Sequence, residues 1–187
     1  AEEAPAADET VLTSGQSYSN VFHANGGNAA FSVMANTLRG VYGTDVLLAT
    51  ANSFTGSVLK ADYNQKMAAA MIMHNSLMSR QRTMTGAELK EVVRAFVEGC
   101  EGGFVPFNRG SLPIVSGIAV EVKEASGSYT LTGITRNGQP LRDDDTVTVT
   151  CLAPEKQMAA LLADENGTPA DEDTWVKNVW RDYVWGG

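Results

Sequence analysis

The sequence predicts an α+β fold, a single compact domain with a mixed β-sheet flanked by helices. Segments with the 3.6-residue period of amphipathic helices alternate with short apolar runs that are typical of buried strands. From Ile114 onward the apolar residues recur at every second position, as in half-buried antiparallel strands. The dipeptide Asn137-Gly138 separates two of these runs and is a strong hairpin signal. Helices interleaved with strands, followed by clustered hairpins, are typical of an α+β domain.

Length and composition favour one domain. The chain has 187 residues, 43% of them hydrophobic, which is enough for a sizeable core. The Ala/Glu/Pro-rich start predicts a flexible linker over residues 1–15, so the domain is expected to span 16–187. The start lacks the basic and apolar regions of a signal peptide, and it has no initiator Met. We therefore expect a mature product or a piece of a longer protein.

The charge balance excludes several kinds of partner. The formal net charge is −8, so no basic patch is expected that could release counterions from nucleic-acid phosphates. The same acidity disfavours anionic membrane surfaces. No apolar run approaches the roughly 20 residues that a membrane-spanning helix needs. We expect neither a nucleic-acid partner nor a membrane span.

The first half of the chain is predicted to begin with a helix over residues 28–42 that carries one apolar face and stops at Gly43. The continuous apolar run 46–49 predicts a buried strand, and residues 50–57 a polar loop. A helix over 62–70 and a strand over 72–84 are expected next.

A capped helix over residues 85–98 is the clearest local signal. Thr85 at the N-cap and Glu88 at the N3 position form a capping box, in which each residue satisfies a backbone donor of the other. One apolar stripe follows, made of Leu89, Val92, Val93, Phe96 and Val97. Gly99 is a suitable stop for this helix.

The second half begins with a loop-rich segment over 101–113, and strands follow it. Expected strands cover 118–122, 129–136 and 146–151, and expected helices cover 155–163 and 171–185. Asp143, Asp144 and Asp145 lack the spacing of a calcium loop and are expected to form the turn before a strand.

Residues for catalysis are scarce. A dinuclear metal centre needs a cluster of Asp, His and Asn, but the two histidines, His23 and His74, stand in no such cluster. Serine-hydrolase elbows and glycine-rich phosphate loops are also missing. Cys100 and Cys151 could form a disulfide or remain free thiols. We expect no metal site and no cofactor in this chain.

Three motifs, in order, resemble the C-terminal domain of the 5′-nucleotidases, which are bacterial and eukaryotic ectoenzymes. These motifs are the helix segment 84–97, the strand opening 115–118 and the turn segment 137–145, and the resemblance spans roughly residues 28–152. It implies a compact mixed domain that follows a metallophosphatase domain and closes over it. It also implies an exported protein, extracellular, periplasmic or at the cell surface. Divalent metal ions are expected only on that upstream domain, which would leave this chain inactive alone.

The same resemblance implies a site for a nucleotide-like small molecule. Family members carry Asn-x-Gly-x-x-Arg after the first strand, where this sequence has Asn52, Phe54 and, in place of the Arg, Thr55. They carry Pro-Phe-x-Asn further on, where Met73 stands in the Phe place and Asn75 matches. The third family motif, with its second aromatic and its Asp, is absent from residues 152–158.

Two interpretations of these positions stay open. Phe54 could be the aromatic platform of a rebuilt pocket or a buried anchor beneath a surface loop. Asn75 could contact a ligand or form a turn. If the pocket is lost, the chain is a degenerate, non-catalytic structural or interaction module of a bacterial surface protein.

Overall fold

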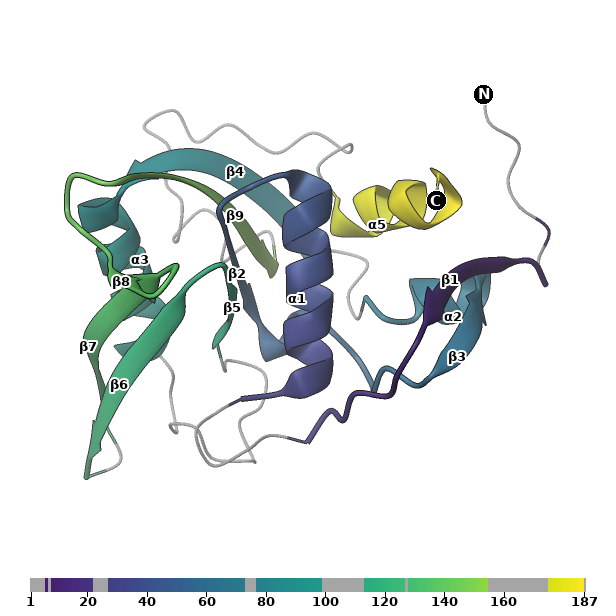
Figure 1. Ribbon diagram of the computed structural model, residues 1–187, viewed down its shortest axis with the longest axis horizontal. Coiled ribbons are helices and arrows are strands. Elements are labelled where there is room, and N and C mark those ends of the chain that lie inside the picture. The colour runs from purple at the N-terminus through teal and green to yellow at the C-terminus, as the bar shows by residue number, and fades with distance from the viewer. Residues whose placement is uncertain are drawn as a thin grey trace.

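The computed structural model confirms the predicted α+β class (Figure 1). It describes residues 6, 8–21, 27–72, 77–98, 113–126, 128–154 and 175–186. The central sheet has four strands in the order β4 (Leu77–Thr85), β9 (Thr146–Pro154), β2 (Val46–Thr50) and β5 (Pro113–Ser116). The β2–β9 pair is parallel and the other two pairs are antiparallel, so the sheet is mixed.

Helices and a second sheet cover the two faces of the central sheet. Helix α1 (Ala29–Tyr42) packs on one face. Helix α3 (Gly86–Glu98) lies on the other, together with a three-stranded sheet of β6 (Ala119–Ala125), β7 (Ser128–Arg136) and β8 (Gln139–Pro140).

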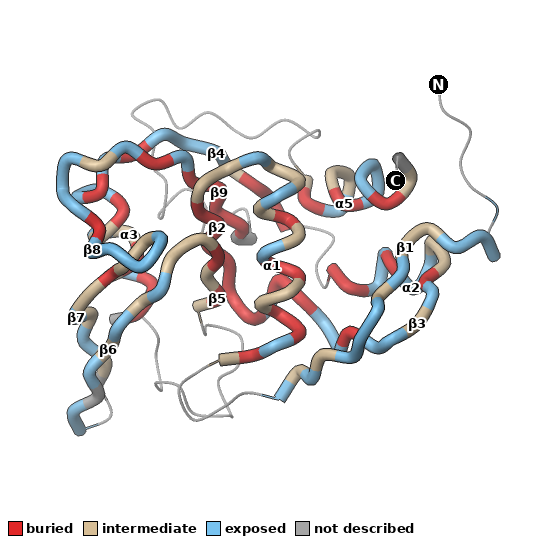
Figure 2. The backbone as a smooth tube through the Cα atoms, viewed as in Figure 1, coloured by how far each residue is buried: buried red, intermediate tan, exposed pale blue. Residues whose placement is uncertain are grey.

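Strand β2 lies between two hydrophobic clusters and is buried along its whole length (Figure 2). Leu47 and Ala49 belong to the cluster under α1, whereas Val46 and Leu48 belong to the cluster under α3. Alternate side chains of a strand point to opposite faces, so a strand buried on both faces is apolar at successive positions. This is why the run 46–49 is continuous rather than alternating.

Local signals correctly predicted both long helices. The Asn28 side chain accepts a 2.9 Å hydrogen bond from the Phe31 N–H at the start of α1, and Gly43 ends the helix in the left-handed conformation. At α3 the capping box is complete. The Thr85 N–H donates to Glu88 Oε2 at 2.8 Å, and the Glu88 N–H donates to Thr85 Oγ1 at 3.2 Å.

Two of the three motifs behind the family resemblance meet in space. The Gly86 N–H donates to the Asp145 carbonyl at 2.7 Å, and the Ala87 N–H donates to the Asp143 carbonyl at 3.1 Å. Lys90 Nζ reaches Asp143 Oδ1 at 2.7 Å. The start of α3 is therefore held against the turn that precedes β9.

The late hairpins follow the predicted turn chemistry. Asn137 and Gly138, between β7 and β8, both adopt positive φ, at 52° and 75°, as a type I′ turn requires. Before β9 the Arg142 N–H donates to Asp145 Oδ2 at 2.8 Å. The prediction of a turn at the three aspartates is confirmed.

Near the N-terminus the structure corrects two expectations. Thr10–Ser14 is strand β1, paired antiparallel with β3 (Ala61–Asn64), so these residues are not part of a flexible linker. The predicted helix over 62–70 was too long, because its first turn belongs to β3. Only α2 (Gln65–Ala69) is helical, capped by the Asn64 side chain on the Met67 N–H at 3.0 Å.

The last helix, α5 (Val176–Gly186), falls within the expected helix over 171–185 apart from its final residue, and it docks on the domain. Val176, Trp180 and Val184 are buried in the same cluster as α1. The expected helix over 155–163 lies outside the described residues. No helix in the described ranges is both long and apolar enough to cross a membrane.

Candidate functional site

The predicted site begins where β2 ends, at the carboxyl edge of the central sheet. A 3₁₀ turn, η1 (Ala51–Ser53), follows the strand directly and leaves Asn52 exposed. Ser53 is fully buried, and its hydroxyl has no hydrogen-bond partner among the described residues. A buried hydroxyl without a partner costs about 1–3 kcal/mol of free energy.

Phe54 is a core residue. Its side chain is 2% exposed, and its ring centroid lies 5.8 Å from that of Phe31 at an angle of 47°. Its backbone forms an antiparallel bridge with Ile72. The Phe54 ring therefore has no exposed face on which a base could stack. Of the two interpretations, Phe54 fits the buried anchor. The sequence alone did not decide this, because Phe31 and Ile72 are distant in the chain.

Thr55, three residues after Asn52, is exposed, and its N–H donates to the Met71 carbonyl at 3.2 Å. The loop over 50–57 therefore presents the amide of Asn52 and the hydroxyls of Thr55 and Ser57 at the surface, and it carries no charged residue. The other two candidate residues, Met73 and Asn75, lie outside the described residues, as does the segment that follows Pro154.

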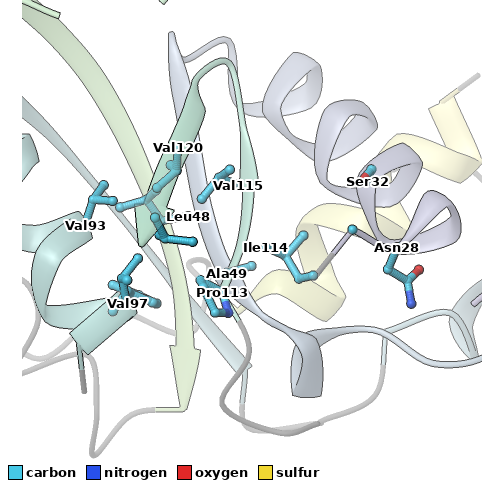
Figure 3. Close-up of a pocket in the computed structure, with 13 residues that line it drawn as sticks. Asn28, Ser32, Leu48, Ala49, Val93, Val97, Pro113, Ile114, Val115 and Val120 are labelled. Atoms are coloured by element: carbon cyan, nitrogen blue, oxygen red, sulfur yellow. The ribbon is translucent and has the colours of Figure 1, made fainter. Parts of the chain in front are cut away.

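A second feature, which the sequence did not predict, is an apolar cavity of about 170 Å³. It lies between α3 and the strands β2 and β5, near the N-terminus of α1 (Figure 3). Leu48 and Ala49 come from β2, Val93 and Val97 from α3, and Ile114 from β5. Such a cavity depends on how well elements that are distant in the sequence pack against each other. The hydrophobic periodicity of the sequence gives no information on this packing.

One of the two polar side chains at the rim of this cavity already has hydrogen-bond partners. Asn28 is 3% exposed, accepts from the Phe31 N–H, and donates from Nδ2 to the Asn20 carbonyl at 2.8 Å. Ser32 is the other polar side chain at the rim. The cavity therefore suits an apolar group and has no charged side chain, among its described lining residues, to hold a phosphate.

Buried ionisable groups in the core are not poised for catalysis. Burial raises the pKa of the Cys151 thiol to about 12 and that of the Tyr42 phenol to about 12, so both stay protonated at neutral pH. Cys151 is a free cysteine, and Cys100 lies outside the described residues. In the part of the chain that the structure describes, no group of three or more His, Cys, Asp or Glu is arranged to hold a metal ion.

The sequence matches no known family model and no curated protein. Solved structures match nearly the whole chain. A 5′-nucleotidase precursor from Thermus thermophilus aligns with 96% of the chain at a TM-score of 0.63 and 14% sequence identity. This chain has a 5′-nucleotidase fold. At such low identity the likeness concerns the fold, and the predicted fold of a 5′-nucleotidase C-terminal domain is confirmed.

Two further structures share the 5′-nucleotidase fold with this chain. The Haemophilus influenzae NAD nucleotidase aligns with 92% of the chain at 16% identity and a TM-score of 0.60. The Thermus thermophilus sulfate thiohydrolase SoxB aligns with 95% at 12% identity and a TM-score of 0.60. The chain covers 37%, 31% and 32% of these three proteins, respectively. This chain spans about a third of the length of each of these proteins, so it corresponds to one part of them.

Proposed function

We propose that this chain is the substrate-binding, capping domain of an exported 5′-nucleotidase-type metallophosphohydrolase. The proposal rests on the structural alignments. Almost all of this chain aligns with about a third of each of the three solved structures. The remaining two thirds of those neighbours leave room for a separate catalytic domain. In this proposal that domain lies upstream and holds the metal ions.

The described residues of this chain do not fit a dinuclear metal centre, because they contain no cluster of suitable ligands. Their proposed role is to position the substrate. Asn52 and Thr55 are exposed at the end of β2, where an amide and a hydroxyl can donate to substrate oxygens. Asn75 is proposed to join them, on the strength of the family resemblance.

The substrate class is a nucleotide-like phosphoester. The described part of the loop lacks both a basic residue for phosphate and an open aromatic face for a base. Because each base–aromatic stack is worth about 1–3 kcal/mol, we expect weak binding of simple nucleoside monophosphates. SoxB, as a sulfate thiohydrolase, shows that this fold also occurs in an enzyme of different substrate chemistry.

The alternative is a non-catalytic structural or interaction module. The burial of Phe54 favours it, since the aromatic side chain nearest the predicted site fills the core instead of a pocket. The two proposals differ in one measurable respect, which is whether the loop after β2 binds a small molecule.

Thermal denaturation with added ligands separates them. The probes are AMP, UDP-glucose and inorganic phosphate, tested on the 187-residue chain and on Asn52→Ala and Thr55→Ala variants. A retained site predicts stabilisation by mass action, about 2.7 kcal/mol when ligand is at 100 times its Kd. This stabilisation should decrease in both variants and persist in Thr130→Ala, which changes an exposed threonine on β7. No stabilisation of the unmodified chain by any probe favours the module.

A second experiment tests the proposed upstream domain. The coding sequence upstream of Ala1 is translated and searched for Asp-x-His and Gly-Asn-His-Glu motifs behind a signal peptide. Their presence supports an exported two-domain hydrolase. If they are absent, this domain has no catalytic partner in the same chain, and the hydrolase proposal is abandoned. Hydrolysis of AMP by the 187-residue chain alone, with Mn²⁺ present, would contradict the proposal that catalysis belongs to the upstream domain and substrate binding to this one.

A further inference from the structure

A groove of about 310 Å³ lies between α2 and α5, away from the loop after β2. Both helices are visible at one end of the molecule, next to β1 and β3 (Figure 1). A hydrogen bond of 2.8 Å from Trp180 Nε1 to the Ala68 carbonyl joins α5 to α2. This bond connects the two helices that line the groove.

One wall of the groove is apolar and partly aromatic. Trp180 and Val184 are 2% and 4% exposed, and the half-buried Trp185 extends the wall along α5. The guanidinium carbon of Arg181 lies 5.2 Å from the centroid of the Trp185 ring, a cation–π distance. This contact helps to hold the indole in a fixed orientation.

The charge of the groove is opposite to that of the whole protein. Lys66 of α2 and both Lys177 and Arg181 of α5 line it, and no Asp or Glu is among its described lining residues. The chain as a whole has 14 basic and 22 acidic side chains. Arg181 also pairs with Asp182 at 2.8 Å, but that carboxylate is 66% exposed and lies outside the groove lining.

Helical spacing produces this arrangement. Lys177, Arg181 and Trp185 are four residues apart in sequence, so they occupy neighbouring positions on one face of α5. Lys66 comes from the other side of the groove. A ligand between the helices would contact an aromatic ring at one end and cations nearby.

We propose that this groove binds a small organic anion that carries a carboxylate on a flat apolar body. The flat body would pack on Trp185 and Val184, and the carboxylate would accept charge-assisted hydrogen bonds from Lys66 and Arg181. The volume is at the lower end of the range for small-molecule sites, which fits a body of one or two rings. This site shares no residue with the loop after β2, so it is independent of the proposed function.

The test uses nuclear magnetic resonance of the tryptophan indoles in the 187-residue chain. All three tryptophans, Trp175, Trp180 and Trp185, lie in or next to α5, so their Nε1–H signals report on this region. The probe is 2-naphthoate, and the matched control is the neutral 2-naphthamide. We expect 2-naphthoate to shift the Trp185 signal saturably and to bind about tenfold more tightly than 2-naphthamide.

Charge-removing variants complete the test. Lys66→Gln and Arg181→Gln should each weaken 2-naphthoate binding by about tenfold. Lys123→Gln removes the same charge from an exposed position on β6 and should leave the affinity unchanged. An unchanged Trp180 signal shows that α5 remains docked in each variant. Equal binding of 2-naphthamide, an unmoved Trp185 signal, or wild-type affinity in both groove variants would overturn the proposal.

Discussion

Trp180 and Ala68 are joined by a hydrogen bond of 2.8 Å between residues 112 positions apart. The indole N–H of α5 donates to a carbonyl of the five-residue helix α2, while the ring is almost fully buried in the core under α1. The bond satisfies the only polar atom of a large buried side chain. The C-terminal helix is thus an integral part of this domain.

The first prediction concerns this contact. Trp180→Phe removes the donor, leaves the Ala68 carbonyl without this partner, and reduces the buried volume. We expect it to lower the free energy of unfolding by about 1–3 kcal/mol. The measurement is urea denaturation monitored by circular dichroism. Trp185→Phe, at a half-buried position on the same helix, should have a smaller effect. Equal effects would mean that the bond contributes little.

The second prediction concerns Asp45, which joins the starts of β2 and β9. Its Oδ2 accepts the Thr148 backbone N–H at 2.9 Å and the Thr148 hydroxyl at 3.0 Å, and its other oxygen pairs with Arg136. The backbone hydrogen bond is the main reason that the pKa of Asp45 is lowered from its ordinary value of 3.8. Because the folded pKa lies below the unfolded one, the stabilisation is present above about pH 3.8 and is lost as the pH falls through the folded pKa.

Asp45→Asn should therefore cost stability at neutral pH, about 1 kcal/mol or less, since the side chain is 34% exposed and partly screened by solvent. The difference from wild type should shrink below about pH 3.8. Urea denaturation at several pH values measures it. Asp144→Asn alters a carboxylate that is 72% exposed, and it serves as the control with little expected effect. A difference that stays constant down to the lowest pH would contradict this assignment.

The third prediction compares two helical glycines. A Cβ on Gly86 would overlap the carbonyl oxygen of Arg142, whereas a Cβ on Gly40 in α1 would meet nothing within 4 Å. Alanine favours a helix interior by up to about 1 kcal/mol, but overpacking costs about 1–3 kcal/mol. Gly86→Ala should therefore destabilise the protein, and Gly40→Ala should stabilise it by about 0.5–1 kcal/mol. If the melting temperature rises in both variants, the backbone at Arg142 shifts to make room for the added Cβ at little cost, and the prediction for Gly86 is wrong.

The fourth prediction concerns Cys151, which is fully buried in β9 and has a pKa raised by burial to about 12. Only the thiolate is a good nucleophile, so Cys151 should resist iodoacetamide in the native protein and react once the protein is unfolded in guanidinium chloride. Peptide mass spectrometry after labelling at neutral pH distinguishes this residue from Cys100. Rapid native labelling of Cys151 would mean that β9 opens readily.

Sequence reasoning succeeded where the physical cause is local. The capping box at Thr85 and Glu88, the type I′ turn at Asn137 and Gly138, and the stop at Gly43 each depend on residues within a few positions of one another. The buried strand at 46–49 was also correct, because burial on both faces leaves a continuous apolar run.

The sequence by itself determined the two long helices α1 and α3, the turns and the α+β class, since backbone capping, turn conformation and apolar period are encoded over short spans. Only the tertiary structure decided that Thr10–Ser14 is a strand, that residues 61–64 are its partner, and that Phe54 packs on Phe31. It also decided where the cavity and the α2–α5 groove lie. Each of these features arises from contact between segments far apart in the chain, where the burial of one residue depends on the position of another.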